Sequence, residues 1–263
     1  MSDGETIKYA TFDGSDVLSF IAGKENSDSA VLVIHEIWGL TNFIKNYSRK
    51  ISELGFMAFS PHLYSRKDVY SLFSQENISG AMKLFFEVPP DKRTEKEFIE
   101  KTMRRATTEE REVITRLLIN RAEMEKTMIK DLSMAYQYLK NELKVKKIGV
   151  VGFCMGGGLS FQISTQLPFD ATVVYYGANP KNLDDIANIK GPVLAVYAGN
   201  DDGINSGVPD MVRSFIKFGK QIELKIYPGT RHAFANTDGF AFNKDAADDS
   251  WNRVSAFFTK YLR

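Results

Sequence analysis

The sequence is poor in the residues that cross-link a chain or carry it through a membrane. Its 263 residues include one cysteine, Cys154, so no disulfide can form within the chain. A lone cysteine fits a reducing compartment. No run approaches the roughly 18 to 20 apolar residues of a membrane helix, and the first 30 residues lack the apolar stretch of a signal peptide. We therefore expect a soluble, cytoplasmic protein with no membrane association.

Charge and metal-ligand patterns are equally sparse. The net charge is +1, which gives no bulk electrostatic attraction to nucleic acid or to an anionic membrane. There are three histidines, and His232 has no second His or Cys at ligand spacing. The pair His35-Glu36 lacks the second histidine of a zinc-protease helix. We expect no metal, no organic cofactor and no nucleic-acid partner.

Short apolar segments that alternate with helical patterns are what the chain does have. Continuous apolar runs of strand length occur at 30–36, 56–61, 147–151 and 171–177, and segments of helical periodicity such as 41–55 separate several of them. This alternation predicts an α/β fold with a doubly wound, mostly parallel sheet and helices on both faces. In such sheets ligands bind at the carboxyl ends of the strands.

One segment interrupts the alternation. Residues 66–130 are rich in Lys, Arg, Glu and Met at helical spacing, and Thr107 with Glu110 forms a capping-box pattern. We predict a single domain over 1–263 with a helical insertion at 66–130. Two interpretations stay open: the insertion caps a site, or it is a surface excursion with a solvated charged face.

Reactive side chains follow the predicted strands. Gly152-Phe153-Cys154-Met155-Gly156 is the nucleophile-elbow pattern with Cys in place of Ser. The turn would expose the sulfur at the N-terminus of a helix, whose dipole favours a thiolate, and would aim the Met155 N–H at a developing oxyanion. The alternative is a buried, inert cysteine in a glycine-rich turn.

The order of the other polar residues supports the catalytic interpretation. An aspartate, Asp201 or Asp202, and then His232 follow Cys154, each just after a predicted strand. Nucleophile, acid and histidine in this order are typical of α/β-hydrolases. His35 and His62, in a buried strand and a turn, are interpreted as structural.

Five segments together identify a family resemblance. They are VIHEIWGL (33–40), SPHLY (60–64), GFCMGGG (152–158), YAGNDDGIN (197–205) and YPGTRHAF (227–234). With them the chain resembles the dienelactone hydrolase family (carboxymethylenebutenolidases) of the α/β-hydrolase superfamily. The resemblance implies a triad in which Cys154 is the nucleophile, His232 the general base and Asp201 the acid, with Asp202 as the alternative.

The resemblance also implies roles for two residues after the strand at 30–36. Glu36 matches a glutamate that contacts the thiol and takes part in its activation, and Ile37 would supply a second oxyanion-hole N–H beside Met155. The chain departs from the family pattern at Asn236, where an arginine would hold a substrate carboxylate. Dienelactone itself is therefore not fixed as the substrate.

The predicted function is hydrolysis of a small ester or lactone through a thioester acyl-enzyme. Two alternatives remain: a non-hydrolytic binding or redox-responsive module in which Cys154 is a sensor thiol, and an acyltransferase. The expected partner is a small-molecule ester or lactone. The sequence does not indicate an oligomeric state.

Overall fold

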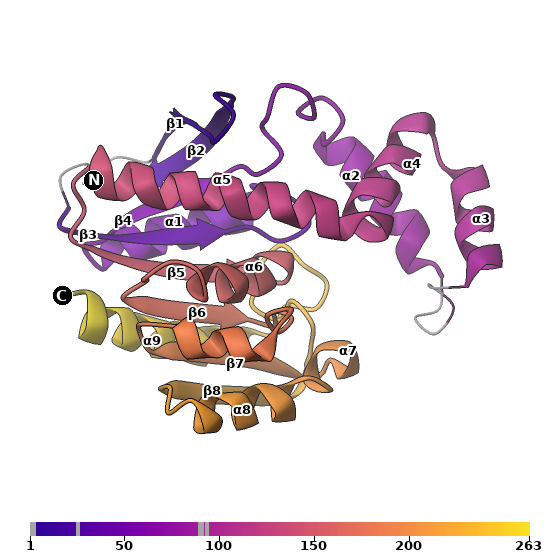
Figure 1. Cartoon of the computed structure of the whole chain (residues 1–263). Helices are drawn as coiled ribbons and strands as arrows, with labels where there is room; N and C mark the ends of the chain where they lie inside the picture. The colour runs from indigo at the N-terminus through magenta and orange to yellow at the C-terminus, as the bar shows by residue number, and fades with distance from the viewer. Residues whose placement is uncertain (1–3, 25–26, 89–91, 93–94) are drawn as a thin grey trace.

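The computed structural model describes residues 4–24, 27–88, 92 and 95–263 (Figure 1). Eight strands form one sheet in the order β1-β2-β4-β3-β5-β6-β7-β8. Every neighbouring pair from β4 to β8 is parallel, and β2 is antiparallel to both β1 and β4. The strands are β1 (Glu5–Ala10), β2 (Asp16–Ala22), β3 (Ser29–Ile34), β4 (Met57–Pro61), β5 (Lys147–Phe153), β6 (Ala171–Tyr175), β7 (Val193–Asn200) and β8 (Ile222–Arg231). The predicted mostly parallel sheet is confirmed.

Helices cover both faces of this sheet, as the sequence predicts. Helices α1 (Asn42–Glu53) and α9 (Lys244–Leu262) pack on one face. Helices α5 (Arg121–Asn141), α6 (Met155–Ser164) and α8 (Val208–Lys217) pack on the other. Because β3 lies between these layers, its side chains are almost all buried and alternate between the two cores.

The insertion forms a separate group of helices beyond one end of the sheet, to the right in Figure 1. It contains α2 (Gln75–Phe86), α3 (Lys96–Arg105), α4 (Thr108–Ile114) and a π-helical turn, η2 (Thr115–Ile119). The Thr107–Glu110 capping box at the start of α4 is confirmed. The predicted limit at 130 falls within α5, which runs on along the sheet to Asn141.

The remaining helices are short. A 3-10 helix, η3 (Leu183–Asn188), precedes β7, and α7 (Asp202–Asn205) follows it. In the part of the chain that the structure describes, no helix combines the length and the apolar character needed to cross a membrane.

Candidate active site

Cys154 lies at the sharp turn from β5 into α6. Its backbone has φ 55° and ψ −115°, in the left-handed region that a residue with a Cβ rarely adopts. The turn closes only because its neighbours are glycines. A Cβ on Gly152 would lie 1.9 Å from the Gly156 carbonyl oxygen, and one on Gly156 would lie 2.4 Å from the Ile34 carbonyl oxygen. The strained elbow that the sequence pattern predicts is therefore present, with the thiol half-buried.

His232 and an aspartate meet beside this turn. His232 lies in the loop after β8, and Asp201 directly follows β7. His232 Nδ1 is 2.6 Å from Asp201 Oδ2. The side chains are 35% and 12% exposed. Asp202, the alternative acid, is exposed at the first position of α7. The structure thus places Asp201 rather than Asp202 against the imidazole.

The surroundings of His232 favour its protonated form. Burial lowers the pKa of the imidazole, but the hydrogen bond with Asp201 and the electrostatic interactions with Asp201 and the Cys154 side chain outweigh burial and raise the pKa to about 10. Asp201 and Cys154 therefore both interact with one imidazole. This is the arrangement needed to hold a proton that moves between sulfur and nitrogen.

Glu36 is a buried carboxyl two residues beyond β3. It is 1% exposed, and its Oε2 accepts a hydrogen bond from Asn236 Nδ2 at 2.6 Å. Its Oε1 has no partner among the described residues. Burial raises the pKa of Glu36 to about 7, although Asn236 and His232 favour the charged form. Its carboxyl oxygens make no hydrogen bond to the Cys154 thiol.

Tyr64 connects the two residues expected to form an oxyanion hole. Its buried hydroxyl donates to the Ile37 carbonyl oxygen at 3.0 Å and lies 3.7 Å from Met155 Sδ. Met155 is the first residue of α6, so its N–H has no acceptor within the helix. Sequence reasoning missed this role of Tyr64, since it lies far along the chain from both partners. Its place just after β4 was the only available signal.

The other two histidines contact each other, with ring centroids 6.0 Å apart. His35 is fully buried, with Nδ1 2.6 Å from the Glu36 carbonyl oxygen and Nε2 accepting from the Leu63 N–H at 3.1 Å. Burial and the neighbouring His62 lower the pKa of His35 to about 3. His35 is neutral and has a hydrogen bond at each ring nitrogen, so it fixes the loop that carries Glu36. This agrees with a structural role.

A cavity of about 700 Å³ adjoins this group of residues. Its walls include Trp38, which follows Ile37, and Ala233, which follows His232, as well as Asn236 and Phe240. Its size fits a small organic molecule. The lining contains none of the six site residues that the sequence predicts, but Trp38 and Ala233 are direct chain neighbours of two of them.

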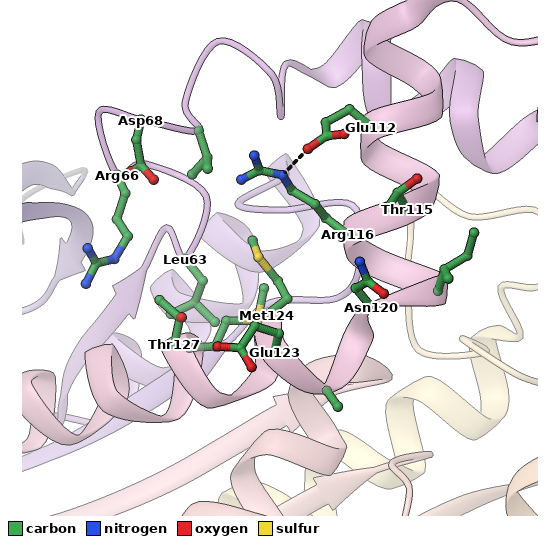
Figure 2. Close-up of a pocket in the computed structure, with 14 residues that line it drawn as sticks. Leu63, Arg66, Asp68, Glu112, Thr115, Arg116, Asn120, Glu123, Met124 and Thr127 are labelled. Atoms are coloured by element: carbon green, nitrogen blue, oxygen red, sulfur yellow. Dashed lines mark hydrogen bonds and ion pairs between the residues drawn. The ribbon is translucent and has the colours of Figure 1, made fainter.

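A second cavity, of about 550 Å³, lies between the loop after β4 and the start of α5 (Figure 2). Arg116 and Glu112 form an ion pair on its wall. Its lining contains none of the six site residues that the sequence predicts. Within the described ranges, no group of three or more His, Cys, Asp or Glu side chains could hold a metal ion.

Comparisons with known proteins agree on one family. The model of the dienelactone hydrolase family matches residues 17–262. A Saccharolobus solfataricus protein named "Putative carboxymethylenebutenolidase" is 44% identical over 248 residues, covering 94% of this chain and 95% of that protein. "Protein usf" of Aquifex pyrophilus is 29% identical over 268 residues, covering 98% and 99%. The crystal structure of a dienelactone hydrolase from Anabaena variabilis shares the fold, with a TM-score of 0.66, 15% identity and full coverage of both chains.

Proposed function

The chain belongs to the dienelactone hydrolase family, a family of carboxylic ester and lactone hydrolases, and on that premise we propose that it acts through Cys154, His232 and Asp201. The observation that carries this assignment is the position of His232, with Asp201 Oδ2 2.6 Å from Nδ1 and the Cys154 side chain close enough to raise the pKa of the same ring. Cys154 is the nucleophile, His232 moves the proton, and Asp201 orients the imidazole and stabilises its positive charge.

The first half of the reaction forms a thioester. The Cys154 sulfur, its proton held by His232, attacks the substrate carbonyl carbon and gives a tetrahedral oxyanion. The backbone N–H groups of Ile37 and Met155 donate to that oxyanion. When the intermediate collapses, His232 gives its proton to the leaving alkoxide. The alcohol departs, or, from a lactone, the hydroxyl end of the opened ring moves away.

The second half releases the acid. His232, now neutral, takes a proton from a water molecule as that water attacks the thioester carbonyl. Collapse of the second tetrahedral intermediate breaks the C–S bond, restores the Cys154 and His232 pair and frees the carboxylic acid. Esters and lactones suit this mechanism better than amides, because a thiolate is itself a better leaving group than an amine anion.

Glu36 belongs to the proposed site as a buried carboxyl that interacts electrostatically with His232. Its pKa of about 7 makes it neutral in mildly acidic solution and charged in mildly basic solution. Asn236 holds the carboxyl in place, through the hydrogen bond to Oε2.

The insertion is proposed as a cap of one domain that spans 1–263. Phe86 at the end of α2 lies 6.4 Å, ring centroid to ring centroid, from Trp38. Trp38 follows Ile37 and lines the cavity of about 700 Å³. The insertion therefore reaches the rim of the proposed substrate space.

The test is mass spectrometry of the intact protein during brief exposure to p-nitrophenyl acetate, with nitrophenol release followed in parallel. We expect turnover and a transient acetyl adduct in the wild type, and neither in Cys154→Ala. In His232→Gln, acylation slows sharply because no base takes the proton. The assignment would be overturned if wild type and Cys154→Ala released nitrophenol equally and neither protein formed an acyl adduct, with p-nitrophenyl acetate or with any lactone of a panel. That result would favour a sensor thiol.

A further inference from the structure

The last strand of the sheet has an open edge. The Val193 N–H donates to the Gln221 carbonyl oxygen at 3.1 Å, and the register with β7 continues in parallel along β8. In a parallel ladder alternate residues bond to the neighbouring strand. The backbone groups of Ile222, Leu224 and Ile226 therefore point away from β7. Open N–H and C=O groups of this kind are a template for another strand.

The side chains of these three residues are apolar and share one face of the sheet. Leu224 is 40% and Ile226 41% exposed, while Ile222 packs partly against the core under α8. Helix α8 runs along β8 at the lower margin of Figure 1, and its Ile216 is 75% exposed. The open edge thus carries apolar surface as well as backbone groups that have no partner among the described residues.

We propose that β8 pairs antiparallel with β8 of a second copy of this chain, about a two-fold axis at Leu224. In this register Leu224 faces Leu224 of the second copy, and Ile222 faces its Ile226. These are the residues whose backbone groups point outward, so each facing pair can exchange two N–H to C=O hydrogen bonds. The interface is self-complementary, as a two-fold dimer requires.

Charge selects this register from its alternatives. A two-fold axis at Leu224 places Glu223 directly opposite Lys225 of the second copy, and this pair occurs twice. An axis at Ile222 would place Glu223 opposite Gln221, and an axis at Ile226 would place Lys225 opposite Tyr227. Only the Leu224 axis pairs the opposite charges, at positions where facing side chains lie closest.

The neighbouring residues agree with a short ladder. Pro228 is the next residue whose nitrogen would point outward, and it has no N–H to donate. Lysine and proline on an edge strand usually oppose pairing with other chains. In the proposed register Lys225 faces Glu223 of the second copy, and Pro228 lies beyond the paired region. The edge therefore opposes unrelated strands more than it opposes a second copy.

Charge reversal tests the register, with sedimentation velocity as the measurement. We expect the wild type to have an apparent mass twice the 29.7 kDa of one chain. Glu223→Lys and Lys225→Glu each place like charges opposite one another twice, so each raises the dissociation constant about tenfold. The double variant restores both pairs and the wild-type dissociation constant. A monomeric wild type over about a hundredfold range of concentration, or one dissociation constant for all four proteins, would overturn the proposal. Circular dichroism checks the fold of each variant without reference to activity.

A disulfide trap tests the axis independently. Leu224→Cys in a Cys154→Ala background leaves one cysteine per chain. Facing Cα atoms in a hydrogen-bonded pair lie about 5.5 Å apart, within the range of a disulfide. We expect a covalent dimer on mild oxidation. Lys8→Cys in the same background, on β1 at the opposite edge, is the matched control and stays monomeric on a non-reducing gel. Equal cross-linking of both variants, or none at Leu224→Cys, contradicts the two-fold axis.

Discussion

At the scale of single residues, the proposed site contains groups whose conformation or burial is unfavourable in free energy. Cys154 holds a left-handed backbone, and Glu36 holds a carboxyl oxygen away from any partner among the described residues. Backbone strain of the kind at Cys154 costs on the order of 1 to 3 kcal/mol per residue. The glycines around the elbow leave room for the turn, and Asn236 donates a hydrogen bond to the other carboxyl oxygen of Glu36.

Tyr64 is a positioning residue in the proposed mechanism. Tyr64→Phe keeps the ring, which stacks on Phe73 with centroids 4.5 Å apart, but removes the hydroxyl that binds the Ile37 carbonyl. Loss of one oxyanion donor costs about 10² to 10³ in kcat, so we expect this indirect change to lower kcat about tenfold. KM should stay near the wild-type value, because the tetrahedral oxyanion exists only after attack.

The matched control for that measurement is Tyr197→Phe, which removes a buried hydroxyl without a partner among the described residues. It should leave kcat unchanged. Steady-state kinetics on p-nitrophenyl acetate give both constants. A rise in KM alone, or equal losses in the two variants, would show that Tyr64 does not support the oxyanion site.

Glu36 gives the fold a pH dependence. Its pKa rises from 4.5 to about 7 on folding, so between these values the native state binds a proton that the unfolded state has lost. The free energy of unfolding therefore falls as the pH rises through this window, by about 3 kcal/mol in total. Glu36→Gln cannot titrate and lacks this component. Guanidinium unfolding of both proteins at several pH values measures the difference, and parallel curves would refute the shift.

At the scale of elements, a buried ion pair joins the two ends of the insertion. Arg66 Nε and Nη2 each lie 2.8 Å from an oxygen of Asp131 on α5, and Nη1 lies 2.8 Å from Asp13 in the β1–β2 turn. Arg66 is 7% exposed and Asp131 0%. The pair thus fixes the loop after β4, helix α5 and the first hairpin to one another. The buried pair therefore links the two ends of the helical insertion.

Breaking this pair should destabilise the protein strongly. Arg66→Met leaves the Asp131 carboxylate buried without its cation, at a cost of about 3 to 5 kcal/mol of unfolding free energy. Arg66→Met with Asp131→Leu removes both charges and should recover much of the loss. Denaturant unfolding compares the three proteins.

An exposed ion pair provides the control. Lys146 and Asp28 lie 2.9 Å apart and are each 72% exposed, so Lys146→Met should change the stability by less than about 1 kcal/mol. A double variant at Arg66 and Asp131 that is no more stable than the single variant would argue against coupling between the two charges.

At the scale of the whole molecule, the parallel sheet assembles the candidate site. Glu36, Cys154, Asp201 and His232 each follow a different strand, and parallel strands bring their carboxyl ends to one edge. The final strand, β8, also forms the margin of the sheet. The same strand thus carries the approach to His232 and the surface that we propose for a second copy.

The sequence by itself determined the local features. Apolar runs and helical periodicity predicted the strand and helix order, because each depends on nearby residues alone. The glycine pattern predicted the elbow at Cys154, since the crowding there arises between close neighbours in the chain. The order of Cys154, an aspartate and His232 placed three groups at one edge of the sheet.

Only the tertiary structure decided how distant side chains pair. In that structure Asp201, rather than Asp202, is hydrogen-bonded to His232. Asn236 donates to Glu36, 200 positions away in the chain, and the Tyr64 hydroxyl donates to the Ile37 carbonyl oxygen. These contacts join residues from different strands and loops. Their distances depend on how the layers close, and no local pattern of residues encodes that closure.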